Sequence, residues 1–320
     1  MMSTPTSEIY FLTGAAGFVG ANLLESLLAD QLEVHILLKK ESKTWRIDHL
    51  LSHAHLHVHF GSLENRDDVQ ELIKKVQPTV IYHLATRGAY STQNEAEQIF
   101  ETNLNGTLYL LEAASQLKSH LKLFVNTSSS SEYGTKPSAM KESDLLEPDS
   151  FYAVSKTAAT LLSQLYAKKY EVPVVTFRLF SVYGPWEEPT RLMPKLLQSL
   201  KIGKDLEMVS PETARDFIYI GDVIELYRKV ELLKKFPGYI FNVGTGKQST
   251  LKEVTEFAKN ASGKSINFLW QKMPAKSWDK NIWVADMGFA QQTLNWEAHT
   301  TLEKGLQEMW RWMNDNDRFY

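Results

Sequence analysis

The chain contains 320 residues, of which 43% are hydrophobic, so it can form one large or two smaller domains around a substantial core. A formal net charge of −3 disfavours a nucleic-acid partner held by phosphate contacts, and the lack of cysteine excludes disulfides, thiol nucleophiles and zinc–thiolate sites. No signal-peptide hydrophobic region precedes residue 9 and no apolar stretch approaches the ~18 residues of a membrane span, so we expect a cytoplasmic protein with no membrane partner.

Short apolar runs alternate with helical patterns along the first 180 residues. This alternation predicts an α/β fold with a doubly wound parallel sheet and helices on both faces. After Ser181 the elements become shorter and most of the tryptophans occur, which indicates a smaller C-terminal domain. The expected strands are Ile9–Thr13, Val34–Leu38, Leu56–Phe60, Thr79–Ala85, Leu121–Thr127 and Val174–Phe180, and the expected helices are Phe18–Leu28, Asp67–Val76, Glu95–Leu117, Phe151–Tyr170 and Leu302–Met313.

Gly14, Gly17 and Gly20 lie between the first strand and the first helix. Glycine permits positive φ and close approach of a phosphate to the backbone, and the N–H groups of a helix N-terminus attract a pyrophosphate. The spacing Gly-x-x-Gly-x-x-Gly differs from the Gly-x-Gly-x-x-Gly of many dehydrogenases, so an ordinary turn with close helix packing is the alternative. The position between a strand and a helix favours a dinucleotide site.

The second strand ends in Leu38-Lys39-Lys40, with no carboxylate where NAD sites usually hold the adenosine ribose. Two ammonium groups at this place favour a 2′-phosphate, so we expect NADP as the cofactor, in contact with Lys39 and Lys40. NAD, with a loop of solvated lysines, is the alternative.

Tyr152 and Lys156 lie four residues apart on the helix expected to begin at Phe151, so both face one side. A free tyrosine has a pKa of ~10, and a nearby ammonium group together with an oxidised nicotinamide lowers it. Tyr152 can then exchange a proton with a sugar hydroxyl or carbonyl while a hydride moves to or from the nicotinamide, and Lys156 can hold the nicotinamide ribose. We expect Ser129, in the serine run that follows the fifth strand, to hydrogen-bond the same substrate oxygen and to complete the catalytic set.

These segments together resemble the extended short-chain dehydrogenases/reductases, within them the NAD(P)-dependent nucleotide-sugar epimerase/dehydratase family. The resemblance covers nearly the whole chain and implies a Rossmann-type domain comprising 1–180, to which 217–245 returns with a strand at Tyr239–Val243. It implies that 181–216 and 246–320 form a substrate-binding lid domain, and that the chain is a homodimer as its relatives are. The resemblance is carried, in the family's order, by Gly14–Gly20, His83–Ala85, Asn103–Thr107, Ser128–Gly134, Tyr152 with Lys156, Arg178–Pro185, Arg215–Tyr219 and Asn242–Gly246.

The resemblance also implies which residues bind the cofactor and a nucleoside-diphosphate sugar. Arg215 is expected on the diphosphate, because a guanidinium suits phosphate geometry. Arg87 is expected to reach the sugar, with an ordinary loop position as the alternative. Arg191 is expected to contact the nucleotide, with a salt bridge within the lid as the alternative. The implied cofactor residues, besides Lys39 and Lys40, are Gly14, Ala16, Gly17, Phe18, Val19, Leu63, Leu84, Ala85, Thr86, Asn103, Thr127, Tyr152, Lys156, Phe180 and Val182. The implied substrate residues are Arg87, Ser130, Ser181, Arg191, Arg215 and Lys272.

Departures from the family's pattern reduce the number of reactions that the chain is expected to catalyse. Members that remove water resemble one another in an acidic residue two places before the Tyr-Gly of the serine segment. Ser131 stands at that place and Glu132 is shifted by one, which weakens a 4,6-dehydratase interpretation unless a local bulge moves Glu132 into range.

Two enzyme interpretations follow, and Lys39 and Lys40 favour the first of them. A reductase consumes its cofactor, which suits NADPH, so we expect reduction of a 4-keto sugar nucleotide by hydride transfer with Tyr152 as acid/base. The alternative is an NAD-dependent nucleotide-sugar 4-epimerase, which oxidises and re-reduces one carbon. A 4,6-dehydratase and a non-catalytic cofactor-binding protein are less favoured.

Four histidines alternate at His53, His55, His57 and His59, so a strand places several imidazoles on one face. No carboxylate or thiol accompanies them in the sequence. We therefore expect a polar strand face and no metal site.

Overall fold

The computed structural model describes residues 8–90, 92–274 and 282–319. These residues form two compact units. None of the helices in these ranges has the length and hydrophobicity needed to cross a membrane. One unit lies within Met1–Gly134, Leu146–Arg178 and Tyr227–Phe241, and the other within Thr135–Leu145, Leu179–Leu226 and Asn242–Tyr320.

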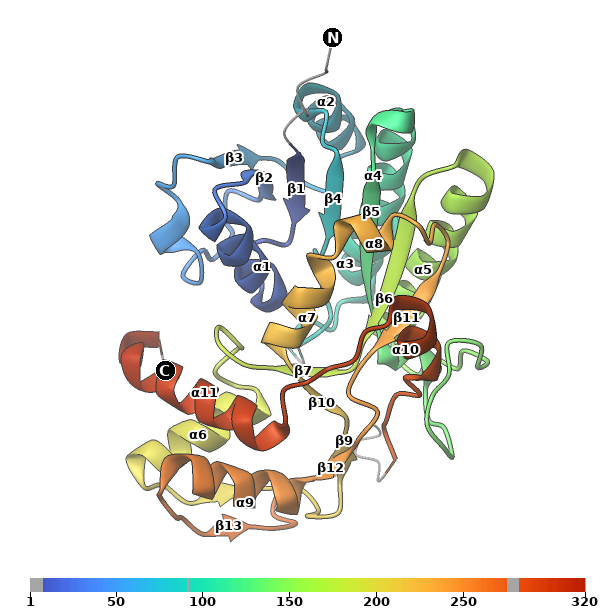
Figure 1. Ribbon diagram of the computed structural model, residues 1–320. Coiled ribbons are helices and arrows are strands. Elements are labelled where there is room, and N and C mark those ends of the chain that lie inside the picture. The colour runs from blue at the N-terminus through green and yellow to red at the C-terminus, as the bar shows by residue number, and fades with distance from the viewer. Residues whose placement is uncertain (1–7, 91, 275–281, 320) are drawn as a thin grey trace. The chain divides into compact units, whose positions relative to one another are not determined.

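A seven-stranded sheet in the order β11-β6-β5-β4-β1-β2-β3 is the main feature of the first unit (Figure 1). The pairs β1–β2, β2–β3, β1–β4 and β4–β5 are parallel. Strands β4 and β6 are buried along their whole length, as expected for strands covered on both faces. This confirms the predicted α/β fold with a parallel sheet. The strands are β1 (Ile9–Thr13), β2 (Glu33–Leu38), β3 (Leu56–Phe60), β4 (Val80–His83), β5 (Leu123–Ser129), β6 (Val174–Leu179) and β11 (Ile240–Val243).

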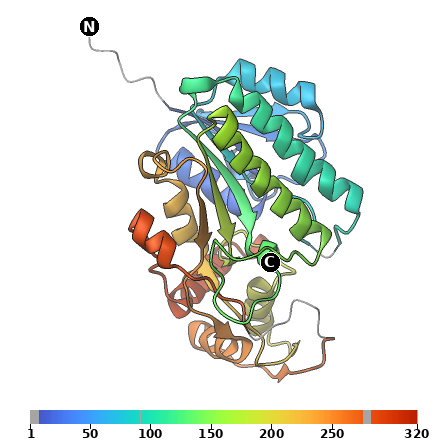
Figure 2. The same cartoon turned by 90° about the vertical axis from the view of Figure 1, so that its right-hand side faces the viewer.

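Helices α2, α4 and α5 lie side by side over one face of this sheet (Figure 2). Their apolar residues form one core with the strands, to which α2 contributes Val69 and Ile73 and α5 contributes Tyr166. The helices of this unit are α1 (Phe18–Ala29), α2 (Arg66–Val76), α3 (Ala96–Phe100), α4 (Gly106–Ser115), α5 (Phe151–Tyr170) and α8 (Val230–Leu233), with 3₁₀ turns at Asp48–Leu50, Lys118–His120 and Ser130–Tyr133.

The single helix expected over Glu95–Leu117 is wrong in one respect, because a π-helical turn at Glu101–Asn105 separates α3 from α4. A π turn inserts one extra residue, and such turns are frequent at functional sites. The periodicity of the apolar residues is too coarse to show this insertion. One of its two buried residues, Asn103, makes side-chain hydrogen bonds that are described below.

The second unit is built from three two-stranded sheets and a group of amphipathic helices. Helices α6, α9 and α11 share a core that includes Leu196, Val254 and Met309. A capping box in which Thr250 and Glu253 bond each other's backbone begins α9. The helices are α6 (Leu192–Ile202), α7 (Ile220–Tyr227), α9 (Leu251–Ser262), α10 (Gly288–Leu294) and α11 (Leu302–Asp315), with a 3₁₀ turn at Asp317–Phe319. The strand pairs are β7 (Ser181–Tyr183) with β10 (Phe217–Tyr219), β9 (Ala214–Arg215) with β12 (Ser249–Thr250), and β8 (Leu206–Glu207) with β13 (Phe268–Leu269).

Candidate active site

The glycine turn connects β1 to α1 and requires glycine for steric reasons. Gly14 has φ of 74°, and a Cβ there would lie 2.5 Å from the backbone N of Ala85. A Cβ on Gly20 would lie 2.1 Å from the carbonyl oxygen of Gly14. Gly17 is the N-cap of α1, and glycine has no side chain that could bond the N–H groups of the first helical turn. Such a turn fits the pyrophosphate of a dinucleotide.

A series of buried, hydrogen-bonded side chains lies next to this turn and contacts the last residue of β1. Thr13 Oγ1 lies 2.7 Å from His83 Nδ1, and His83 Nε2 lies 2.8 Å from Thr107 Oγ1. The Thr107 hydroxyl donates to the carbonyl of Asn103 and therefore accepts from His83 Nε2–H, which assigns the tautomer. Burial, and then the charge of Lys156, lower the pKa of His83 to about 3, so the ring is neutral. This series of hydrogen bonds fixes the end of β4, where the backbone N–H of Ala85 donates to the Thr13 hydroxyl.

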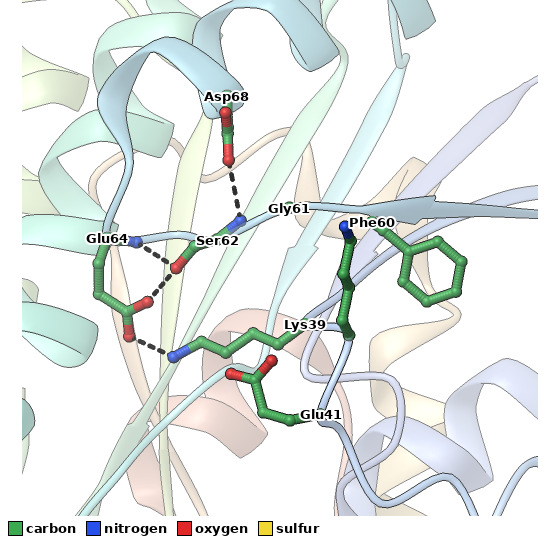
Figure 3. A pocket seen from close by; sticks show the side chains of 8 residues that line it. Lys39, Glu41, Phe60, Gly61, Ser62, Glu64 and Asp68 are labelled. Carbon is green, nitrogen blue, oxygen red and sulfur yellow. Dashed lines mark hydrogen bonds and ion pairs between the residues drawn. The ribbon is translucent and has the colours of Figure 1, made fainter.

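A cavity of about 520 Å³ opens at the ends of β2 and β3 (Figure 3). Lys39 Nζ donates to Glu64 Oε1 at 2.7 Å, and Glu64 also accepts from Ser62 and Thr102. Partial burial acts to raise the pKa of Glu64, but these three bonds outweigh it and lower the pKa to about 2. Three carboxylates and two ammonium groups line the cavity, so its wall is not a cationic surface: the residues are Lys39, Lys40, Glu41, Phe60, Gly61, Ser62, Glu64 and Asp68.

Tyr152 lies in the first turn of α5, whose N-cap Ser150 accepts from the backbone N–H of Ala153. Asn103 connects this turn to the loop after β4. Its Oδ1 accepts from the backbone N–H of Arg87, and its Nδ2 donates to the Arg87 carbonyl and to Ser155 Oγ, at 2.8, 2.8 and 2.9 Å. Ser155 Oγ in turn donates to the carbonyl of Tyr152. The Asn103 amide thus holds the backbone on which the phenol is carried.

Lys156 is 4% exposed, which is unusual for a lysine. Burial lowers its pKa to about 8, against an opposing effect of the Glu132 carboxylate. A buried ammonium on the helix that carries Tyr152 is the arrangement that stabilises a phenolate. The cation titrates close to neutral pH rather than far above it.

The serine run lies at the end of β5 and in the 3₁₀ turn that follows. Ser129 is half-buried, and its hydroxyl accepts from the backbone N–H of Ser131 and donates to the Ser131 hydroxyl, both at 3.1 Å. Ser130 is 5% exposed. Ser129 is therefore the half-buried hydroxyl at the end of β5, and its role toward a substrate stays a prediction.

Glu132 is fully buried, and no bulge brings it to a surface. Its carboxylate accepts from Arg178 Nε at 2.7 Å and from Thr160 Oγ1 at 2.6 Å, and Ser128 also donates to it. All of these partners are protein groups. Glu132 is therefore engaged in the interior and does not take the place of the acid that Ser131 lacks.

The other expected cofactor residues occupy varied environments. Leu63 and Leu84 are buried, and the Thr127 hydroxyl lies 2.7 Å from the hydroxyl of Tyr227. Ala16, Phe18 and Val19 are half-buried in and after the glycine turn, and Thr86 donates to Asn103. Phe180 and Val182 belong to the second unit.

The expected substrate residues are divided between the two units. In the first unit, Arg87 Nε is buried and has no hydrogen-bond partner among the described residues, while Nη2 lies 3.7 Å from Glu95. In the second unit, the Arg215 guanidinium lies 5.3 Å from the Trp283 ring centre and donates to the Ala214 carbonyl. Ser181 begins β7, whereas the exposed Arg191 caps α6 and Lys272 lies exposed after β13.

Sequence reasoning missed several of these groups. Glu64, Ser155 and Thr107 were assigned no role, although each lies within a few residues of an expected site residue. Arg46 is 6% exposed and its guanidinium lies 3.5 Å from the carbonyl of Ala16 in the glycine turn. The premise that no carboxylate accompanies the histidines is wrong, because Glu33 of β2 lies beside His35 and His57.

A sequence model of the GDP-mannose 4,6 dehydratase family matches residues 11–309. Among curated proteins, the chain is 27% identical over 317 residues to the UDP-glucuronate 4-epimerase of Thermodesulfobacterium geofontis, with 96% of each chain covered.

Two solved structures at similar identity have the same fold. The UDP-glucuronic acid 4-epimerase from Bacillus cereus, in complex with UDP-glucuronic acid and NAD, has a TM-score of 0.83 and 27% identity over 96% of this chain and 99% of that chain. The dTDP-glucose 4,6-dehydratase from Bacillus anthracis, in complex with NAD, has a TM-score of 0.84 and 25% identity over 98% of this chain and 99% of that chain.

Proposed function

The chain belongs to the GDP-mannose 4,6-dehydratase family, an enzyme family of nucleotide-sugar epimerases and dehydratases of the extended short-chain dehydrogenase/reductase type, and from this premise we propose that it is an NAD-dependent nucleotide-sugar 4-epimerase. The observation that carries the choice among reactions is the bond between Lys39 and Glu64. In the sequence the two lysines favour NADP and a reductase. Because Glu64 binds one of them, we now favour NAD and an epimerase.

The residues of the first unit fit a dinucleotide. The turn at Gly14 and the open N-terminus of α1 would hold the pyrophosphate, and the cavity beside Lys39 would hold the adenosine. A 2′-phosphate there would meet the carboxylates of Glu41, Glu64 and Asp68, and the ammonium of Lys39 is already bound. A neutral ribose suits this wall better than a phosphate does. The solved relatives cited above contain NAD.

When bound, NAD would supply a reversible acceptor of hydride at the carbon that carries the reacting oxygen. Tyr152 would take the proton from the C4 hydroxyl of the sugar and return it after the sugar has presented its other face. Lys156 would stabilise the phenolate by its charge, and Ser129 would hydrogen-bond the same sugar oxygen. The proton and the hydride both return to the sugar, so the reaction is a net inversion with no net redox change.

The position of Glu132 supports epimerisation over dehydration. Loss of water requires an acid that can protonate the departing hydroxyl. Ser131 cannot supply that proton as readily, and the carboxylate of Glu132 is buried in its bond to Arg178. We therefore favour the epimerase reaction over the 4,6-dehydratase reaction.

For the substrate we propose a UDP-sugar, first UDP-glucuronic acid and UDP-glucose. The support is the similarity to epimerases that are named for UDP-glucuronate. Arg215 and Arg191 would bind the diphosphate, with Ser181 and Lys272 as further contacts, because guanidinium groups match phosphate geometry. Arg87, with its unpaired Nε, and Ser130 would contact the sugar.

The test is to incubate the purified protein with each UDP-sugar without added cofactor. We expect the 4-epimer to accumulate to equilibrium, seen by NMR, with no net change in nicotinamide absorbance. Stoichiometric consumption of NADPH with a 4-keto sugar nucleotide, and no epimer, would contradict the proposal and establish the reductase. Formation of a 4-keto-6-deoxy product would establish the dehydratase.

The reductase is the second candidate, and one observation favours it. Lys40 lines the adenosine cavity and is exposed, and Arg46 lies beside the glycine turn. On this second interpretation, these two cations would pair with a 2′-phosphate while Lys39 stays bound to Glu64. Comparing the two dinucleotides by calorimetry separates the candidates, because the epimerase proposal requires tighter binding of NAD.

We also propose a homodimer that pairs through α5. This helix exposes Leu161 and Leu165, which are 55% and 48% exposed and lie four residues apart on one face. Apolar residues at this spacing favour packing against another helix. Light scattering after size exclusion should give twice the mass of the chain, and Leu161→Lys should shift it to the single-chain value.

A further inference from the structure

A cluster of imidazoles and one carboxylate lies on the face that β2 and β3 turn toward the α2 side of the sheet. We call it the His–Glu cluster. His35 of β2 is opposite His57 of β3 in the parallel register, and Leu37 of β2, part of the core under α2, is opposite His59. Because side chains alternate along a strand, the members share this face: Glu33, His35, His57 and His59.

The ligand atoms of three members already converge. Glu33 Oε1 lies 3.2 Å from His35 Nε2 and 3.9 Å from His57 Nε2, and the three ligand atoms lie within 4.8 Å of one another. A tetrahedral zinc site with metal–nitrogen distances of ~2.0–2.1 Å places its ligand atoms roughly 3.3 Å apart. Binding an ion would therefore require the side chains to rotate, including the stacked rings of His35 and His57.

His59 supplies an outer contact that orients His35. His59 Nε2 lies 2.9 Å from His35 Nδ1, so it would accept the Nδ1 hydrogen when the Nε2 lone pair of His35 binds an ion in place of its present hydrogen bond to Glu33. Metal-binding histidines commonly donate their second ring nitrogen to such a partner, which fixes both the tautomer and the ring orientation. The sequence provides this partner two residues beyond His57.

Two charged side chains act on the cluster, one of each sign. Lys75 of α2 is the cation that opposes a bound ion, and the Glu33 carboxylate is the anion that favours one.

We propose that Glu33, His35 and His57 form a site for a divalent transition metal, with Zn²⁺ as the best-matched ion, and that His59 orients His35 within it. Two imidazoles and one carboxylate suit zinc, copper and nickel better than magnesium or calcium, which prefer oxygen ligands. His57 and Glu33 are 45% and 38% exposed, so water would complete the coordination. An ion held there would join the edge strand β3 to β2 through their side chains.

The experiment measures Zn²⁺ retention by equilibrium dialysis of the full chain, purified without a histidine tag and stripped of metal. We expect one Zn²⁺ per chain and no retention of Mg²⁺. His35→Ala and His57→Gln should each weaken Zn²⁺ binding by at least about tenfold, and His59→Ala by about tenfold. His53→Ala, a neighbouring histidine outside the cluster, should change the affinity by less than about twofold.

Thermal unfolding supplies a second readout. Zn²⁺ should raise the unfolding temperature of the wild type and of His53→Ala but not that of His57→Gln, because only binding to the folded state stabilises it. Circular dichroism establishes that each variant is folded; if His35→Ala is not, the exposed position 57 decides alone. Failure of the wild type to retain Zn²⁺, or wild-type retention by His57→Gln, overturns the site.

Discussion

The carboxylate of Glu132 accepts a hydrogen bond of 2.7 Å from Nε of Arg178, and the two side chains are 0% and 2% exposed. The same guanidinium donates to the Tyr133 hydroxyl at 3.0 Å and lies over the Tyr133 ring. Burial acts to lower the pKa of Arg178, and the nearby Glu132 carboxylate outweighs it, so the pKa is raised. The pair joins the serine segment to β6 inside the first unit.

Glu132→Gln should destabilise the fold, because it leaves the Arg178 cation buried without its counterion. Removing one partner of a buried pair typically costs about 3–5 kcal/mol. Chemical denaturation should show this loss in the free energy of unfolding. Glu256→Gln, which breaks the exposed pair with Lys259, should cost less than about 1 kcal/mol. Equal effects of the two substitutions would contradict the role given to the buried pair.

Tyr152→Phe should lower turnover by about 10²–10⁴-fold, which is the usual contribution of a positioned acid/base group. The dinucleotide affinity should change little, because the ring and the hydrogen bonds of Asn103 remain. Initial rates with the active UDP-sugar measure the first effect and calorimetry the second. The control is Tyr170→Phe, at the exposed end of the same helix. Unchanged turnover in Tyr152→Phe would rule out the acid/base role.

The buried lysine should give the stability a defined pH dependence. Because the pKa of Lys156 is about 8 in the folded chain and 10.5 in the reference state, the unfolded chain binds more protons between these values. The contribution of Lys156 to stability therefore rises as pH increases through that window, by up to about 3 kcal/mol.

Lys156→Met isolates this effect, because it removes the titration and keeps most of the volume. The free energy of unfolding of the wild type minus that of Lys156→Met should increase from about pH 8 toward pH 10.5. Denaturant titrations at several pH values measure the difference. A difference that is flat or falls over this range would show that the lysine is not desolvated.

Glu64→Gln should move the cofactor preference toward NADP. The substitution removes the carboxylate that binds Lys39 and leaves that ammonium available to a 2′-phosphate. A hydrogen bond to a charged group contributes about 1.5–3 kcal/mol, so the ratio of NADP to NAD affinity should rise at least about tenfold by calorimetry. Glu231→Gln, in an exposed pair with Lys234, should leave the ratio unchanged. No shift in Glu64→Gln would remove the basis for choosing NAD.

Local patterns in the sequence predict the elements of the first unit well. β1, β3 and α5 have the expected bounds of Ile9–Thr13, Leu56–Phe60 and Phe151–Tyr170, because apolar spacing and the Ser150 cap are local features. The strand expected over Thr79–Ala85 is shorter, since β4 ends at His83 where the backbone turns past Gly14.

The candidate site was predicted less completely, because its bonds join residues that are distant in the sequence. Lys39 and Glu64 are 25 residues apart, and Glu132 and Arg178 are 46 apart. Strand order decides which side chains meet, and a single sequence does not specify that order. The sequence therefore shows the lysines without the carboxylate that binds one of them, and the histidines without Glu33.

The π-helical turn at Glu101–Asn105 separates two helices that pack on different neighbours. Before it, α3 packs on α5; after it, α4 packs on α2 as well as α5. Removing a single amino acid from this segment would rewind it as an ordinary helical turn and change which of its side chains face α5. The segment should therefore tolerate substitution far better than deletion, and a shortened version should lose the alignment of Asn103 with α5 before it loses its helical content.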